Sequence, residues 1–120
     1  MAGKQFKLKP DQIRPLVPRM GGCFASDMIT VGGNKVGYMY REEPGFDADS
    51  GWRFLSGTES QEYLDDPENL QIYNVNTIAN YDPDIIPFLD QPIGSAFERR
   101  QITERFAATD FPYDPMEENS

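Results

Sequence analysis

The stretch that decides the fold reads Val36-Gly37-Tyr38-Met39-Tyr40-Arg41. Residues 36, 38 and 40 alternate with 37, 39 and 41, and this period of two predicts a β-strand with one face packed on a core. The apolar run at residues 23–30 predicts a strand before it. Between the two, Gly32-Gly33-Asn34 tolerates the positive φ of a tight turn. We therefore expect a hairpin over residues 23–41.

Short apolar runs and capping signals predict small elements further along the chain. We expect strands at residues 52–56, 70–73 and 93–98, and helical segments at 58–64, at 76–81 and after Asp82. Thr58 and Gln61 have capping-box spacing, and Asp82-Pro83 offers an N-cap followed by a residue suited to the first helical position. This order of elements predicts an α+β fold, a single small domain with a mainly antiparallel sheet and short helices packed against it.

Charge and proline content divide the chain into three parts. Residues 1–20 form a basic, proline-containing N-terminal arm, in which five Lys or Arg accompany one acid. Its prolines block a helix, so we expect it to be extended. Residues 21–100 are expected to form the α+β domain. Residues 101–120 are expected to begin with a short helical turn, because Ile102 and Phe106 lie four apart, and to end in an acidic mobile tail.

The net charge limits the choice of partner. The chain carries −9, and residues 21–120 alone carry −13. Such a body repels phosphate backbones, so we expect no nucleic-acid partner, whereas a basic protein would be steered toward it. No apolar run reaches the roughly 18 residues of a membrane span, and the N-terminus lacks the apolar core of a signal peptide. We therefore expect a cytoplasmic protein with no membrane partner.

The sequence offers little for catalysis. It contains no histidine, which removes the Ser/His/Asp and Cys/His nucleophile systems and the commonest transition-metal ligand. Cys23, the sole cysteine, is expected to be a small buried thiol. Asp82-Pro83-Asp84 provides two carboxylates for a magnesium ion, but helix capping explains them without a ligand. We expect no catalytic residue, no metal and no cofactor.

An acidic run extends from residue 42 to residue 68, where nine carboxylates accompany Arg53 as the only basic residue. Such a run is either a solvated surface or a protein-binding patch. Trp52 within it either anchors the core or, if partly exposed, anchors an interface. The candidate partner-binding residues are the nine acids and this tryptophan: Glu42, Glu43, Asp47, Asp49, Trp52, Glu59, Glu62, Asp65, Asp66 and Glu68.

Several blocks in a fixed order carry a family resemblance. They are Cys23-Phe24-Ala25-Ser26-Asp27, Val36-Gly37-Tyr38-Met39-Tyr40-Arg41-Glu42-Glu43-Pro44, Asp49-Ser50-Gly51-Trp52-Arg53-Phe54 and Asn76-Thr77-Ile78-Ala79-Asn80-Tyr81-Asp82-Pro83-Asp84-Ile85-Ile86-Pro87. Over about residues 22–99 the chain resembles the thirty-third immunity-protein family of bacterial polymorphic toxin systems. The resemblance implies a small intracellular protein that neutralises a toxin without a cofactor.

Three functions are consistent with the sequence. The first is a non-catalytic immunity protein that neutralises a cognate basic toxin through an acidic face, where complementary charge speeds association. The second is a stand-alone regulatory or scaffold module that binds some other protein. The third is a magnesium-dependent enzyme with Asp82 and Asp84 as its carboxylates. The first two share one expectation, a protein-binding surface.

Overall fold

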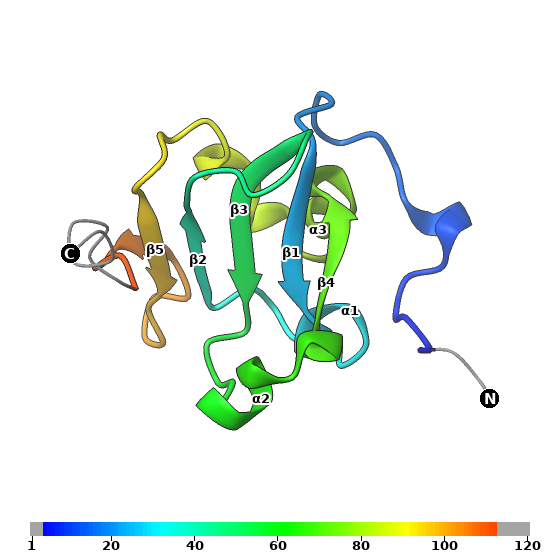
Figure 1. Ribbon diagram of the computed structural model, residues 1–120. Helices are drawn as coiled ribbons and strands as arrows, with labels where there is room; N and C mark the ends of the chain where they lie inside the picture. The colour runs from blue at the N-terminus through cyan, green and yellow to red at the C-terminus, as the bar shows by residue number, and fades with distance from the viewer. Residues whose placement is uncertain (1–3, 113–120) are drawn as a thin grey trace.

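The computed structural model describes residues 4–112, which form one six-stranded sheet with short helices (Figure 1). The strands occur in the order β4-β1-β3-β2-β5-β6. β1 and β3 are parallel, and all other neighbours are antiparallel. The predicted α+β class is confirmed. The strand bounds are β1 Gly22–Ser26, β2 Tyr38–Arg41, β3 Asp49–Leu55, β4 Leu70–Asn74, β5 Ala96–Arg99 and β6 Phe106–Ala108.

Within residues 4–112, the core lies on one side of the sheet. α3 (Val75–Tyr81) and η3 (Pro83–Phe88) lie behind the sheet in Figure 1, and α1 (Asp27–Thr30) packs against α3. α2 (Gln61–Asp65) and η2 (Pro67–Asn69) lie at the lower end of the sheet in the same view. The buried side chains that join sheet and helices are Cys23, Ala25, Ile29, Val36, Met39, Trp52, Phe54, Val75, Ile78, Ala79, Ile85 and Leu89.

The predicted hairpin over residues 23–41 is wrong. β1 ends at Ser26, whose hydroxyl accepts the amide of Met28 and so caps a helix where the strand was expected to continue. The amide of Gly32 donates to the carbonyl of Asp27, so the glycines close the end of α1 rather than a hairpin. β1 and β2 are not neighbours, because β3 lies between them and pairs with both.

Local signals located several other elements correctly. β4 and α3 form at the predicted positions, and Asp82 caps η3 (Pro83–Phe88) by accepting the amide of Asp84. The helix expected at residues 58–64 forms later, because Ser60 rather than Thr58 is the N-cap and its hydroxyl accepts the amide of Tyr63. β3 begins at Asp49, ahead of the predicted strand.

The helical turn predicted after residue 100 is instead the turn of a strand hairpin. Glu104 has φ 58° in this turn, and Phe106 begins β6. Ile102 is 98% exposed, so it forms no buried stripe with Phe106. The predicted strand 93–98 likewise forms only from Ala96. Residues 113–120, which make up most of the predicted tail, lie outside the described residues.

The N-terminal arm is extended except for one 3-10 turn, η1 (Pro10–Gln12), and it lies against the helices of its own molecule, beside α3 and α1. The Asn76 side-chain oxygen accepts the amides of Leu16 and Val17, and Asn80 accepts the amide of Arg14. Nearer the N-terminus, Lys4 forms an ion pair with Asp27 in α1. The arm therefore covers part of the helix side and leaves the opposite face of the sheet uncovered.

Candidate functional site

One face of the sheet carries no helix from the described residues. Among residues 4–112, only α2 and η2 border this face, at the lower end in Figure 1. Half-buried aromatic and aliphatic side chains on an uncovered sheet face are typical of an interaction surface. We call the following residues the helix-free face, because strand alternation places them on the side opposite the core: Phe24, Tyr38, Tyr40, Arg53, Leu55, Leu70, Ile72 and Glu98.

The centre of the helix-free face is a buried ion-pair cluster. The Nη1 and Nη2 groups of Arg53 donate to the two oxygens of Asp49 at 3.0 and 2.8 Å, and Nε donates to Glu42. The guanidinium carbon also lies 4.8 Å from the centre of the Phe24 ring. The Asp49 side chain is 0% exposed and that of Arg53 is 7% exposed. Such desolvated charges are tolerated because the contact is bidentate and well hydrogen-bonded.

A bulge in β3 makes this cluster possible. Residues four apart in a regular strand are separated by about 13 Å. The pairing of β1 with β3 is irregular between Asp49 and Arg53, which draws these two residues together. Gly51 lies within the bulge at φ 90°, and a Cβ there would lie 2.2 Å from the carbonyl oxygen of Glu42. Only glycine allows β2 and β3 to approach this closely.

The electrostatics of the cluster follow from its hydrogen bonds. Burial alone would raise the pKa of Asp49, but hydrogen bonds from Arg53 and from the amides of Gly45 and Gly51 outweigh it and lower that pKa to about 2. Burial alone would lower the pKa of Arg53, but the bonds to Asp49 and Glu42 raise it above its usual range. The ion pair is therefore intact throughout the physiological pH range.

We expect this ion pair to make the protein less stable in acid. A carboxyl whose folded-state pKa of about 2 lies below its unfolded value of 3.8 stabilises the fold above pH 3.8, and loses that contribution as the pH falls through 2. The shift corresponds to about 2 kcal/mol. A ¹³C NMR titration of the Asp49 carboxyl measures it directly, and urea unfolding at descending pH measures its effect. A titration midpoint near the unfolded value would contradict the prediction.

Aromatic side chains cover the β2 side of the helix-free face. The rings of Tyr38 and Tyr40 lie 5.7 Å apart, and Phe111 meets Tyr40 edge-on at 5.5 Å. The Tyr38 hydroxyl donates to the carbonyl of Asp110. Burial raises the pKa of Tyr40 to about 12, and the negative charge of Glu42 acts in the same direction. The phenols therefore stay neutral and present apolar rings with polar tips, as at many interfaces.

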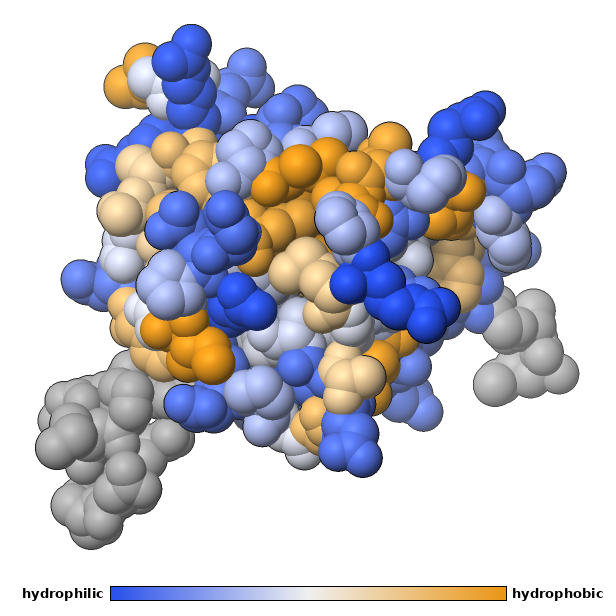
Figure 2. Space-filling view, turned by 90° about the horizontal axis from the view of Figure 1, so that it is seen from above, coloured by the Kyte–Doolittle hydropathy of each residue, from blue (hydrophilic) through white to orange (hydrophobic). Residues whose placement is uncertain are grey.

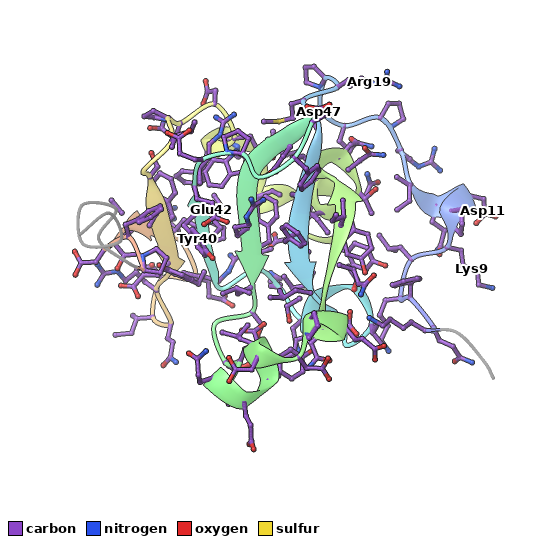
Figure 3. All side chains as sticks on the ribbon, viewed as in Figure 1. Lys9, Asp11, Arg19, Tyr40, Glu42 and Asp47 are labelled. Atoms are coloured by element: carbon purple, nitrogen blue, oxygen red, sulfur yellow. The ribbon has the colours of Figure 1, made fainter. Side chains whose placement is uncertain are left out.

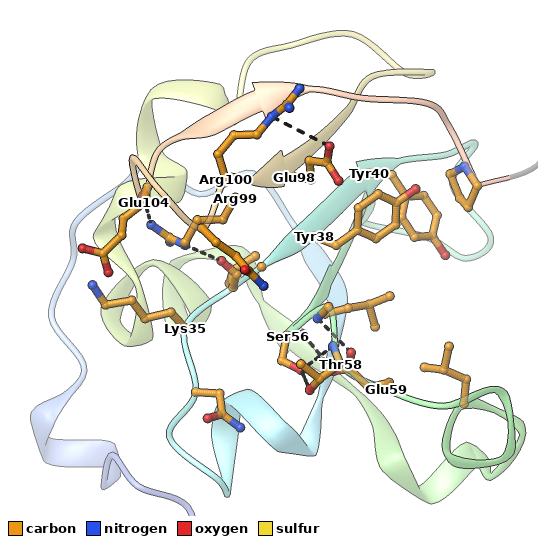
Figure 4. A pocket seen from close by; sticks show the side chains of 18 residues that line it. Lys35, Tyr38, Tyr40, Ser56, Thr58, Glu59, Glu98, Arg99, Arg100 and Glu104 are labelled. Carbon is orange, nitrogen blue, oxygen red and sulfur yellow. Dashed lines mark hydrogen bonds and ion pairs between the residues drawn. The ribbon is translucent and has the colours of Figure 1, made fainter.

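Two pockets open on this side of the molecule. The smaller has a volume of about 420 Å³, and its lining residues are Phe24, Tyr40, Glu42, Arg53, Leu55, Leu64, Asp65, Pro67 and Leu70. The larger, of about 970 Å³, lies between turn 56–59 and the hairpin of β5 and β6 (Figure 4). The pockets share Tyr40, Leu55 and Leu64 in their linings, so they lie next to each other on the face.

Four of the six charged residues that line the larger pocket are bound to other charged groups or to the backbone. Glu98 and Arg100 lie 3.8 Å apart, and Arg99 pairs with Asp84 and with the buried Asp82. Glu59 accepts the amides of residues 56 and 57. Partial burial would raise the pKa of Glu59, but these hydrogen bonds outweigh it and lower the pKa. Three basic residues and three glutamates line the larger pocket, so its lining carries no net charge.

The structure separates the predicted acidic patch into two groups at opposite ends of the helix-free face. Figure 3 places Asp47 at the upper end of the sheet, whereas α2 and η2 lie at the lower end. Figure 2 views the upper end and shows hydrophobic and hydrophilic side chains interspersed there. The exposed members at the upper end are Glu43 and Asp47, and those at the lower end are Glu62, Asp65, Asp66 and Glu68.

The other four predicted partner-binding residues have structural contacts. Trp52 is fully buried and its indole N–H donates to the carbonyl of Leu89, so its anchoring of the core is confirmed and it offers no surface to a partner. Asp49 is buried because it neutralises Arg53, which corrects the expectation of an acidic surface residue. Glu42 and Glu59 are half-buried, the first against Arg53 and the second as the cap of turn 56–57.

Sequence reasoning missed the residues between these two acidic groups. Phe24, Tyr38 and Tyr40 belong to the helix-free face, and Ile72 on β4 is 55% exposed there. The alternation at residues 36–41 was a usable signal for the two tyrosines, but alternation alone does not say which set of side chains points inward. The buried Met39 shows that the tyrosines point away from the core.

The remaining candidates for chemistry have structural roles. Asp82 is 2% exposed, and its oxygens accept the amides of Val36 and Asp84 and the guanidinium of Arg99, so the capping role is confirmed. Cys23 is buried as predicted, and burial raises the pKa of its thiol. No three of the His, Cys, Asp and Glu residues within 4–112 are grouped so that they could hold a metal ion.

Comparison with known proteins identifies the class. The family described as the Immunity protein Imm33 domain matches residues 23–109, from β1 to the end of β6. The chain therefore belongs to the Imm33 immunity-protein family, as the sequence resemblance indicated. The match spans nearly the whole sheet and excludes the N-terminal arm. No curated protein and no solved structure matches the chain. No helix in the described part of the chain is long and apolar enough to cross a bilayer.

Proposed function

We propose that this protein is a non-catalytic immunity protein that neutralises a cognate toxin by binding it with the helix-free face. The observation that carries the proposal is the family match over residues 23–109. The toxin is a protein with a basic surface, since the chain carries −9 overall. The single thiol at Cys23 is consistent with action in the reducing cytoplasm.

The helix-free face supports this role by its composition. Half-buried rings and aliphatic side chains at the centre of an interface supply most of the affinity, because they bury much area at small entropic cost. Exposed charges at the rim chiefly set the association rate and the choice of partner. This face has the same arrangement, with Phe24 and Tyr40 between two acidic ends. The opposite side of the sheet is occupied by its own helices and by the arm.

A growth-rescue experiment tests the proposal. Each gene flanking the coding sequence is induced in a host cell with and without this protein. We expect one of them to stop growth and co-expression to restore it. A variant on the face, Ile72→Lys, is expected to lose the rescue, whereas the matched control Ile93→Lys is expected to keep it. The two isoleucines are 55% and 45% exposed, and only the first lies on the helix-free face.

The toxin-neutralising role and the location of the binding surface can fail independently in this experiment. If no flanking gene is toxic, or if growth recovers without this protein, the toxin-neutralising role is wrong. If Ile72→Lys protects as well as the parent protein, the role stands but the binding surface is elsewhere. A pull-down that recovers only metabolic or signalling proteins would instead favour a regulatory binding module.

We expect the acidic ends of the face to speed association with the toxin. Replacing one acid at each end, in Asp47→Asn/Glu62→Gln, is expected to slow association about threefold at low salt. The difference from the parent should vanish at 1 M salt, because the screening length there is about 3 Å, compared with about 8 Å at physiological ionic strength. Stopped-flow association rates across a salt series provide the measurement.

A matched control distinguishes a local effect from one of net charge. Asp11→Asn/Asp90→Asn removes the same two charges from exposed positions outside the face, and both variants have a net charge of −7. All four acids are exposed, so neither pair of substitutions alters the core. Equal slowing by the two variants would mean that the acids act only through the overall charge.

A further inference from the structure

We propose that the smaller pocket of the helix-free face is the subsite that takes one arginine or lysine side chain of the partner. The inference rests on the proposed function, because it specifies how the toxin would be recognised. The pocket is formed jointly by β1, β2, β3, the start of β4 and α2, so its residues come from segments far apart in the chain.

The walls of the pocket suit the aliphatic stem of a long basic side chain. Leu55, Leu64 and Leu70 line it together with Pro67, and the rings of Phe24 and Tyr40 complete it. Lysine and arginine bury their methylene stems on apolar surface and keep the charged head at a polar group. A metal ion or a small ammonium ion has no stem and would gain nothing from these walls.

The charge of the pocket selects a cation. Arg53 at its base uses four of its five N–H groups on Asp49, Glu42 and the carbonyl of Trp52. Glu42 and Asp65 line the pocket, and Asp49 lies behind Arg53. These three carboxylates and the one guanidinium have a net charge of −2. An incoming carboxylate or phosphate would therefore meet repulsion and a guanidinium already bound.

Asp65 provides the specific contact for the cationic head. It is exposed, lines the pocket from the end of α2, and one of its oxygens accepts the side-chain amide of Gln61. A carboxylate has room for further donors at its remaining lone pairs. Burial is the main cause of the raised pKa of Tyr40, which also lines the pocket, and the negative charge of Glu42 adds to it.

An NMR titration of the ¹⁵N-labelled full chain tests the subsite with a defined probe. N-acetyl-arginine amide is added at millimolar concentration, and N-acetyl-citrulline amide, which has the same shape without the charge, serves as the control. We expect saturable shifts at the amides of Tyr40, Leu55 and Leu64 with the arginine probe. Binding of the citrulline probe is expected to be about fivefold weaker, the effect of one partly exposed ion pair.

Two neighbouring substitutions make the test specific. Asp65→Asn keeps the oxygen that accepts from Gln61 and removes the charge, so we expect it to reduce arginine binding to the citrulline level. Asp66→Asn, one residue away and not part of the pocket, is expected to leave binding unchanged. Unshifted resonances of core amides such as Ile78 establish that each variant is folded.

The results that overturn the inference are distinct from those that overturn the proposed function. Equal binding of the two probes, shifts in the larger pocket instead, or equal losses in both variants would reject the arginine subsite. Growth rescue in the earlier experiment would still stand in that case. Conversely, selective arginine binding without any toxic flanking gene would support the pocket and reject the immunity role.

Discussion

Trp52→Ala is expected to lower the free energy of unfolding by about 3–5 kcal/mol, the typical cost of deleting a large buried aromatic side chain. The Trp52 side chain is fully buried at the centre of the sheet. Its ring stacks on Phe54 at 5.9 Å, and its indole N–H donates to the carbonyl of Leu89 at 3.1 Å. Truncation therefore leaves a cavity and removes the shorter of the two hydrogen bonds that the Leu89 carbonyl accepts, the other coming from Arg41 at 3.4 Å.

Urea unfolding followed by far-UV circular dichroism measures this loss, because the variant has no tryptophan to follow by fluorescence. Trp52→Phe is the control. It keeps most of the apolar volume and removes only the hydrogen bond to Leu89, so it should cost much less. An unchanged unfolding midpoint in Trp52→Ala would show that the indole is not buried as described.

The second large effect is expected from Arg53→Leu, at about 3–5 kcal/mol of unfolding free energy. The substitution leaves the Asp49 carboxylate, 0% exposed, without its bidentate partner. Burial then acts on Asp49 without the guanidinium that compensates for it. The half-buried Glu42 also loses a partner, so the base of the smaller pocket becomes more negative and less rigid.

A double-mutant cycle isolates the cost of the unpaired charge. Asp49→Asn removes the charge and keeps one oxygen, which can accept the amide of Gly45 or of Gly51 but not both, because the two amides donate to different oxygens of Asp49. Arg53→Leu/Asp49→Asn is therefore expected to be more stable than Arg53→Leu alone, although it carries one more substitution. If the two destabilisations simply add, the pair contributes no coupling and the destabilisation has another cause.

Features governed by nearby residues could be predicted from the sequence. Helix α3 follows from its own apolar spacing, and the cap at Asp82 from an acid placed before Pro83. The burial of Trp52 follows from its size and rarity in a chain with one core. Each of these features depends on interactions within a few residues or on a strong hydrophobic preference, so the tertiary arrangement does not change them.

Features that depend on distant partners could not be predicted. Gly32-Gly33 suits a hairpin turn and the end of a helix equally well, and the capping by Ser26 decided for the helix. The position of β3 between β1 and β2 depends on pairing between distant segments, which no short sequence pattern indicates. The irregular pairing of β3 also brings Asp49 into contact with Arg53, so this member of the acidic run is buried.

The sequence by itself therefore determined the α+β class, the acidic character, the lack of histidine chemistry and the family. These depend on composition and on short patterns, which a chain carries whatever its path. The tertiary structure alone decided which acids reach solvent, which tyrosines point away from the core, and that Phe24, Tyr40 and Leu64 meet in one pocket. The physical reason is that burial and proximity depend on the order of strands in the sheet, and pairs of residues far apart in the chain set that order.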